Sequence, residues 1–559
     1  MPIPPALIML LGAGVVAALD GRARQVVALL VPLLTLWAIW LVPDGPALSL
    51  PFLDYRLTPL EGSALSRLFA TIFAIMAFTG TLFALNQPSR VELPAAMVYA
   101  GGAIGVSLAG DLVTVFVFWE VMAVASTFVI WAAASKTAYR ASMRYVLMHL
   151  FGGMLFMAGL VGYVAETGSV AFTAMQPDSL ATWLLLAGFL VNAGAPPFSS
   201  WLPDAYPEAS FSGMVFLSAF TTKTAVYVLL RGFPGAEILI PIGIYMIFYG
   251  IIYALLENDM RRILAYSIIN QVGFMVCGIG IGSEMALNGA AAHAFTHIIY
   301  KALLLMSAGS VLMMTGGRRK CTDLGGLFKT MPYTAAMGII GALAISSFPL
   351  TSGFISKSMI SQGATDDHMA VVWFFLAAAS AGVFLHAGIK FPWFVFFQKD
   401  SGLRPAEPPL NMKLAMGLFA FLCIGLGVWP EPLYAILPFA VDYVPYTFGH
   451  VVEMLQLLLF SGLAFFLLLP LMKRTLTITL DVDWFYRRVF MAVARDAIAK
   501  AQAAYDEAWA AAEERLERLL AGVFRHHGPH GILARAWPTG SMVLWAVALL
   551  AACLIVYYR

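Results

Sequence analysis

Apolar runs of about 20 residues recur along the whole chain and limit its fold more than any other feature. A helix of that length crosses the hydrocarbon core of a bilayer, where only helices and closed barrels satisfy every backbone polar group. Charged residues make up 11% of the 559 residues, whereas a soluble protein carries about a quarter. The sequence therefore predicts an all-α polytopic membrane protein without an independent soluble domain. The net charge of +2 gives no sign of a nucleic-acid partner.

The apolar runs and the breakers between them predict about sixteen transmembrane helices. Their approximate ranges are 4–20, 25–43, 66–86, 94–110, 112–133, 143–165, 181–196, 212–231, 238–257, 262–282, 286–314, 332–361, 369–396, 411–429, 451–472 and 538–558. Alternate loops then carry the basic residues Arg22, Arg24, Lys136, Arg140, Arg261, Arg262, Arg318, Lys320, Lys399, Arg404, Lys473 and Arg474. The positive-inside rule places these loops in the cytoplasm and both termini outside it. We expect a multi-pass protein of the cell (inner) membrane.

The first apolar run has no basic residue before it, while Arg22 and Arg24 follow it. A cleaved signal peptide has the opposite arrangement, so we expect a retained first span. Neither a CxxC motif nor a Gly-rich loop between a strand and a helix is present, and the four cysteines lie far apart: Cys277, Cys321, Cys423 and Cys553. The sequence predicts no bound cofactor and no metal, so any redox chemistry would belong to partner subunits.

The segment that begins "DVDWFYRRVF" differs from the rest of the chain. Apolar side chains at steps of three and four form one helical stripe from Phe490 to Val523, with charged residues on the other face. This helix is too charged to span a bilayer, so we expect it to lie along the cytoplasmic surface before a last span. One interpretation is a simple interfacial helix. The other, favoured by its length, is a strap across several helices or a neighbouring subunit.

Ionisable side chains inside apolar spans are costly and usually mark a functional pathway. Glu120, Lys223 and Lys357 each lie in such a span. His386 and Lys390 share another span, and Lys390 is near enough to its end to extend toward the surface. For each residue, a salt bridge or a hydrogen bond between helices without a transport role is the alternative.

The stretch "HAFTHIIYKALLLMSAGSV" adds His293, His297 and Lys301 at intervals of four, which places them on one helix face. Pro and Gly also interrupt two spans, in "NAGAPPFSSWLP" before Lys223 and in "SSFPLTSGF" before Lys357. Broken helices in membranes line polar cavities, and two similar breaks suggest an internal duplication around a midplane path. We therefore expect Lys, His and Glu groups joined by water to relay protons.

Four motifs, "WLPDAYPEA", "RRILAYSIINQVGF", "HAFTHIIYKALLLMSAG" and "FPLTSGFISK", closely resemble the antiporter-like membrane subunit family over roughly residues 60–400. This family includes the large membrane subunits of respiratory complex I, Mrp-type Na+/H+ antiporters and membrane-bound hydrogenases. The resemblance implies two inverted five-helix repeats with broken helices. It also implies a relay consisting of Glu120 as the acidic partner of the first half-channel, Lys223 on the following helix, His293, His297 and Lys301 at the centre, and Lys357 at the exit side.

One position departs from the family pattern. The family carries a lysine nine residues before the Trp of "WLPDA", and counting back from Trp201 gives Asn192. An amide can hold water or a cation but carries no proton at neutral pH. Glu120 then lacks its usual counter-charge, unless Lys223 or Arg144 supplies it. Our hypothesis is that Glu120 pairs with Lys223.

These features predict five regions of the chain. N-terminal transmembrane helices occupy residues 1–93, a first antiporter-like repeat 94–282 and a second repeat 283–400. Peripheral transmembrane helices follow at 401–475, and the lateral amphipathic helix with the last span at 476–559.

The stretch "FTTKTAVYVLLRGF" and the short loops resemble the D-type subunit of an Mrp antiporter, whereas the long surface helix and last span resemble the distal subunit of complex I. The sequence predicts a proton-translocating subunit of a multisubunit Na+/H+ antiporter, which is an ion-transport subunit and not an enzyme. Its partners would be other membrane subunits, the lipid bilayer, H+ and Na+. The alternative is a proton-pumping subunit of a complex I-like NADH-quinone oxidoreductase, a hydrogenase or a CO2-capture complex, driven by a partner's chemistry.

Overall fold

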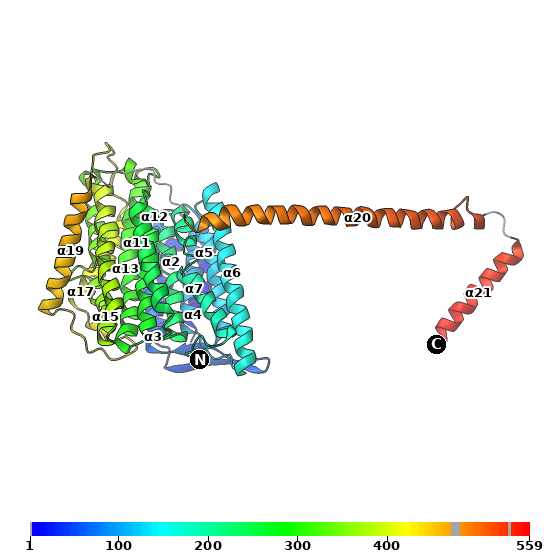
Figure 1. Ribbon diagram of the computed structural model, residues 1–559, viewed down its shortest axis with the longest axis horizontal. Helices are drawn as coiled ribbons and strands as arrows, with labels where there is room; N and C mark the ends of the chain where they lie inside the picture. Colours follow the sequence, from blue (N-terminus) through cyan, green and yellow to red (C-terminus); the bar gives the residue numbers. More distant parts are fainter. Residues whose placement is uncertain (1–2, 471–480, 535–537) are drawn as a thin grey trace. The chain divides into compact units, whose positions relative to one another are not determined.

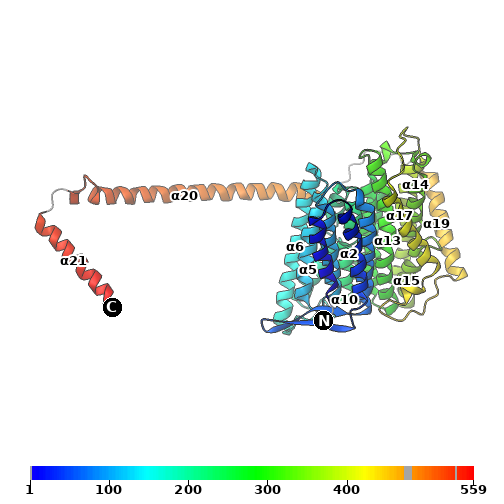
Figure 2. The ribbon, with the colours of Figure 1, turned by 180° about the vertical axis from the view of Figure 1, so that it is seen from behind.

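The computed structural model describes residues 3–470, 481–534 and 538–559. The chain forms two compact units, Met1–Val482 and Asp483–Arg559. The first unit is a bundle whose long helices run side by side (Figure 1), as the view from behind also shows (Figure 2). The second unit contains α20 (Met491–His527) and α21 (Thr539–Tyr557). Lys473 and Arg474, which were assigned to a cytoplasmic loop, lie outside the described residues.

Twelve helices in the described part of the chain are long and apolar enough to cross a bilayer. They are α2 (Gly21–Ile39), α3 (Ala64–Phe83), α5 (Leu112–Trp131), α6 (Lys136–Thr167), the pair α9 (Gly213–Leu217) and α10 (Thr221–Gly232), α11 (Leu239–Leu256), α12 (Met260–Ile281), α13 (Glu284–Met314), α16 (Ala370–Val383) with its continuation to Phe397, α17 (Leu410–Val428), α19 (Phe448–Leu468) and α21. Four shorter apolar helices accompany them: α1 (Pro5–Ala18), α4 (Glu92–Leu108), α7 (Leu180–Ala193) and α14 (Pro332–Ile345). The predicted multi-pass membrane protein is confirmed, while the count of about sixteen spans stays a prediction.

Polar side chains begin several of these helices where the sequence places Ser or Asp before an apolar run. The side-chain oxygens of Ser63, Asp111, Ser135 and Ser179 each accept a hydrogen bond from a backbone N–H in the first turn that follows. The first N–H groups of a helix have no partner inside the helix, so these caps satisfy donors that would otherwise be buried unpaired.

Residues 45–62 form a β-hairpin in a segment that the sequence analysis treated as a connecting loop. Strands β1 (Gly45–Phe52) and β2 (Tyr55–Gly62) pair in antiparallel fashion at the end of the bundle where the N-terminus lies (Figure 1). The Thr58 N–H donates to Oδ2 of Asp111 at 2.7 Å, and Arg231 donates to Oε1 of Glu61 at 2.9 Å. These bonds tie the hairpin to the start of α5 and the end of α10.

The first predicted break is present between α7 and α8 (Trp201–Ala205). Gly194 ends α7 in the left-handed conformation, at φ +78°, which glycine adopts without steric cost. The indole N–H of Trp201 donates to the carbonyl of Val191 at 2.9 Å. The side chain that begins the second half-helix therefore satisfies a carbonyl near the end of the first.

The second predicted break is also present and divides the range 332–361 into two helices. Helix α14 ends at Ile345 and α15 (Ser352–Asp366) begins seven residues later, after a segment in which Ser347 and Leu350 have φ values of +58° and +67°. Such conformations are uncommon for residues other than glycine. The Pro349-containing connection thus interrupts the helix instead of continuing it.

We expect Trp201→Phe to destabilise the protein through the lost indole hydrogen bond at the first break. Trp119→Phe is the matched control, because Trp119 is equally buried and its indole nitrogen has no hydrogen-bond partner among the described residues. In detergent, Trp201→Phe should lower the free energy of unfolding by about 1 kcal/mol more than the control does. Equal losses for the two variants would show that the bond to Val191 contributes nothing.

Candidate functional site

Helix α13 carries the three titratable groups predicted to share one face. His293, His297 and Lys301 are all fully buried, with 0% of each residue exposed. The ammonium group of Lys301 donates to Oγ of Ser267 on α12 at 2.8 Å. A buried charge needs such partners, because leaving one unsatisfied inside a bilayer costs several kcal/mol.

His293 connects two neighbouring helices. Its Nε2 lies 3.1 Å from Oε1 of Gln271 on α12, and its Nδ1 lies 3.1 Å from Oγ of Ser356 on α15. The Tyr300 hydroxyl also donates to Oε1 of Gln271, at 3.1 Å. Ser356 directly precedes Lys357, so these polar contacts run from α13 toward the lysine of the second broken helix.

His297 lies between the other two groups of the row. Neither of its ring nitrogens has a hydrogen-bond partner in the described part of the chain. Its ring centroid is 5.2 Å from that of Tyr300 and 6.2 Å from that of His293. Buried polar atoms are nearly always hydrogen-bonded, so this position is suited to ordered water.

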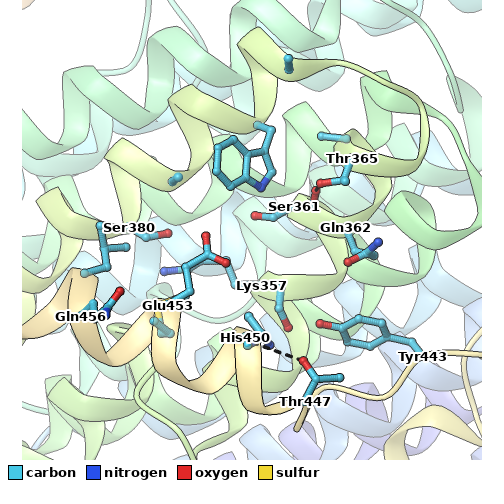
Figure 3. Close-up of a pocket in the computed structure, with 18 of the residues that line it drawn as sticks. Lys357, Ser361, Gln362, Thr365, Ser380, Tyr443, Thr447, His450, Glu453 and Gln456 are labelled. Carbon is cyan, nitrogen blue, oxygen red and sulfur yellow. Dashed lines mark hydrogen bonds between the residues drawn. The ribbon is translucent and has the colours of Figure 1, made fainter.

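Lys357 joins the second break to a cavity. Its ammonium group donates to the carbonyl of Ile345, the last residue of α14, at 3.2 Å, and lies 4.9 Å from the ring centroid of Phe274. Beside it is a cavity of about 1100 Å³ between α15, α16 and α19. Figure 3 shows His450 and Glu453 around this cavity, together with hydroxyl and amide side chains. The break therefore supplies an acceptor for the lysine, and the cavity offers room for water next to it.

Lys223 is bound in a similar way at the junction of α9 and α10. Its ammonium group donates to the carbonyl of Ser218 at 2.7 Å and to Oγ1 of Thr222 at 3.0 Å. Lys223 is fully buried, and α10 packs against both α12 and α13. This packing brings the lysine of the first half close to the helix that carries the central row.

Glu120 has neither of the counter-charges considered for it. No ion pair within 4.0 Å joins its carboxylate to a basic side chain among the described residues, and its Oε1 is buried without a hydrogen-bond partner. Lys223 binds the groups named above instead, and Arg144 pairs with Asp204 at 2.7 Å. The hypothesis that Glu120 pairs with Lys223 is therefore wrong. The carboxylate occupies space that a Cβ at Gly153 would need.

His149 is a buried titratable residue that the sequence analysis did not single out. Its Nδ1 lies 2.7 Å from Oδ1 of Asn192, at the position where the family carries lysine. Its ring packs against Tyr145 and Trp201, with centroid separations of 4.1 and 4.6 Å. The rule that selected Glu120 would have found it, because His149 is an ionisable residue inside an apolar span.

His386 and Lys390 lie on the π-helical segment η5 (Phe384–Lys390) that continues α16. Lys390 does not extend to the surface as expected, because it is 6% exposed and donates to the carbonyls of Ala254, Leu255 and Glu257. It thus caps the end of α11. His386 Nδ1 lies 2.9 Å from the carbonyl of Gly382 on its own helix. For both residues the structure favours the alternative of a bond within or between helices.

Within the residues described, no three His, Cys, Asp or Glu side chains are grouped so that they could hold a metal ion. The polar interior instead consists of single titratable groups, separated by hydroxyl and amide side chains on α10, α12, α13 and α15. Such an arrangement can pass protons in short steps where water joins neighbouring groups.

Comparisons with known proteins agree with these motifs. The family model for the membrane part of NADH:quinone oxidoreductases and Mrp antiporters matches residues 109–384. The D-type subunit of the Na+/H+ antiporter of Alkalihalophilus pseudofirmus is 33% identical over 324 residues, which is 52% of this chain and 64% of that protein. The matched part thus falls short of two thirds of that relative's length.

Two further proteins are matched over a larger share of their own length. The M-type subunit of the NADH-quinone oxidoreductase of Pseudomonas aeruginosa is 31% identical over 374 residues, covering 60% of this chain and 71% of that protein. A chain of the membrane-bound sulfane sulfur reductase, an archaeal respiratory membrane complex, superposes with a TM-score of 0.71 and 25% identity over 98% of this chain and 99% of its own length. The resemblance found in the motifs is confirmed, and the chain belongs to the antiporter-like family of membrane subunits found in NADH:quinone oxidoreductases and Mrp antiporters.

Proposed function

We propose that this chain moves protons through the membrane interior as one subunit of a multisubunit complex. The observation that carries the proposal is the row on α13, where His293, His297 and Lys301 are fully buried on one helix face. Burying three titratable groups inside a bilayer costs free energy that helix packing alone does not require. Such a row therefore indicates a role in transport.

The contacts suggest an order for the steps of the second half. Lys301 lies at one end of the row, His297 follows, and His293 contacts Ser356 at 3.1 Å. Lys223 lies on α10, which packs against α13. Ser356 adjoins Lys357, which lies at the cavity near α19. A proton would pass along this series through the hydroxyl of Ser356 and through water at the unpaired nitrogens of His297. Lys357 would then release it into the cavity.

The two broken helices support an internal duplication. We assign the break of α7 and α8, with Lys223, to a first repeat within 94–282, and the break of α14 and α15, with Lys357, to a second within 283–400. The regions 1–93 and 401–475 would flank this inverted pair. Within the first repeat, Glu120 would be the acidic group.

For the exchanged ion, we propose Na+/H+ antiport, because the relative at 33% identity belongs to a Na+/H+ antiporter. A second candidate is proton pumping powered by a redox partner, which is favoured by the likeness to a respiratory-complex chain over 98% of this chain. Everted vesicles that contain the whole complex distinguish them. Antiport predicts that NaCl collapses a preformed pH gradient, whereas redox coupling predicts proton uptake only with the partner's electron donor.

The C-terminal unit is proposed to contact another subunit of the complex. Helix α20 is unbroken over 37 residues, and its apolar side chains are exposed, among them Ile498, Tyr505, Trp509 and Leu516. Ion pairs four residues apart, such as Lys500–Asp496 at 2.8 Å, also lie along it. An exposed apolar stripe of this length needs a covering surface.

Lys357→Gln should abolish proton transport by the whole complex in everted vesicles. The glutamine amide can still donate to the Ile345 carbonyl, so the fold is kept, but it cannot carry a proton. Lys329→Gln is the control, because Lys329 lies in a surface ion pair with Asp400. Wild-type flux in Lys357→Gln, measured with a pH-sensitive dye, would overturn the assignment of the exit-side lysine.

Ser356→Ala should slow transport without unfolding the protein, because the hydroxyl is the contact between His293 and α15. We expect a loss of about 100-fold, the lower end of what a positioned proton-transfer group contributes. Ser310→Ala provides the matched control: Ser310 is buried on α13, but its hydroxyl donates to the Met306 carbonyl of the same helix. Equal rates for the two variants would exclude the hydroxyl from the path.

Deleting residues 483–559 should release other subunits from the complex while leaving the relay residues in place. Native gels of detergent-solubilised membranes would show the loss, because the exposed stripe of α20 would no longer be present to bind a partner. A fully assembled complex that has lost all transport would contradict this role for the C-terminal unit.

A further inference from the structure

The first half of the bundle contains a proton acceptor that the row on α13 does not include. His149 on α6 is 1% exposed, and its Nδ1 lies 2.7 Å from Oδ1 of Asn192. An amide oxygen only accepts hydrogen bonds, so Nδ1 carries the hydrogen and Nε2 presents a lone pair. That Nε2 is buried and has no hydrogen-bond partner in the described part of the chain.

A second unsatisfied atom lies one helical turn away. Gly153 follows His149 by four residues and therefore lies on the same face of α6. Oε1 of Glu120 fits against Gly153, and it too is buried without a partner among the residues described. Each of these two atoms is a buried polar group without a partner among the residues described, so each is a position for ordered water, because leaving a polar group dry in a membrane interior costs several kcal/mol.

Hydroxyl groups continue from His149 toward Lys223. Tyr145 lies one turn before His149 on α6, and their ring centroids are 4.1 Å apart. The Tyr145 hydroxyl donates to Ser126 at 3.0 Å and lies 3.4 Å from Oγ1 of Thr221, the first residue of α10. The next residue, Thr222, accepts the hydrogen bond from Lys223 at 3.0 Å.

We propose that His149 carries the proton through the first half of the path, in the place where the family has a lysine at position 192, and that Tyr145 and Thr221 connect it to Lys223. This inference rests on the proposed function. A proton passes from the Glu120 carboxyl group through water to Nε2 of His149, which leaves a carboxylate and an imidazolium. The imidazolium then gives up one proton and becomes neutral again, the hydroxyl groups of Tyr145 and Thr221 each pass on their own proton as they take up another, and the last proton is taken up by Lys223 in its neutral form.

The titratable and charged groups around His149 come from all the elements that pack against it. Helix α5 contributes Glu120, the segment after α8 contributes Tyr206, and α6 itself contributes Tyr145 and Arg144, the last paired with Asp204 of α8. Asn192 of α7 is neutral. Among the described residues, Glu120 is the charged group here that has no ion-pair partner.

His149→Gln tests the inference in everted vesicles that contain the whole complex. Glutamine can keep a hydrogen bond to Asn192 but cannot take up a proton, so we expect the flux to fall about tenfold or more. The pH profile should also lose one titration step. Tyr145→Phe keeps the ring and removes the hydroxyl, and it should slow transport as well. Tyr139→Phe is its control, because Tyr139 is an exposed tyrosine of the same helix.

The double variant His149→Gln/Asn192→Lys provides a rescue, since a lysine at position 192, which contacts position 149, restores a titratable group. Flux should return in part and show a changed pH profile. Wild-type flux and pH profile in His149→Gln would overturn the inference, as would a loss that Asn192→Lys fails to restore in correctly assembled complex. Lys357→Gln is measured alongside. If it is inactive while His149→Gln and Tyr145→Phe are normal, only the first-half route fails; if it is active, the proposed function itself fails.

Discussion

Backbone carbonyls at helix ends hold three of the buried ammonium groups of this protein, and its polar interior depends on that interaction. Lys223 binds the Ser218 carbonyl after α9, Lys357 binds the Ile345 carbonyl at the end of α14, and Lys390 binds three carbonyls at the end of α11. The last carbonyls of a helix lack partners and carry partial negative charge. A broken helix therefore stabilises a lysine without a carboxylate, and the lysine satisfies groups that lipid could not. A lysine held by a neutral carbonyl remains free to lose its proton.

The two broken helices bind different donors at their terminal carbonyls. At the second break the ammonium group of Lys357 binds the Ile345 carbonyl at the end of α14, and a cavity lies beside this lysine. At the first break the neutral indole of Trp201 binds the Val191 carbonyl, while Asn192 binds His149. The first half thus places a neutral amide and an imidazole where the second places a lysine. Within the described residues, both halves therefore keep titratable groups that are not locked in ion pairs.

Sequence reasoning succeeded for features that depend on neighbours along the chain. The spacing of four placed His293, His297 and Lys301 on one face, and Pro and Gly located both breaks. It failed where a side chain's partner belongs to another helix. Lys390 was expected near the surface but caps α11. The pairing of Glu120 with Lys223 was wrong, because nothing in the sequence gives the distance between α5 and α10. His149 is an ionisable residue inside an apolar span, so the sequence is enough to mark it as a candidate. Its bond to Asn192 could not be predicted, because Asn192 belongs to another helix.

By itself, the sequence determined that this chain crosses a membrane many times, that two of its helices are interrupted, and that α13 presents a row of titratable groups. Each of these follows from hydrophobicity, from backbone restrictions or from the helical period, which act over a few residues. Only the tertiary structure decided that His293 lies between Gln271 and Ser356, and that Glu120 and His149 each keep an atom without a partner among the described residues. Hydrogen bonds require separations near 3 Å, whereas helix axes lie about 8–10 Å apart. Small differences in helix rotation and register, which depend on the packing of the whole bundle, therefore decide which polar groups meet.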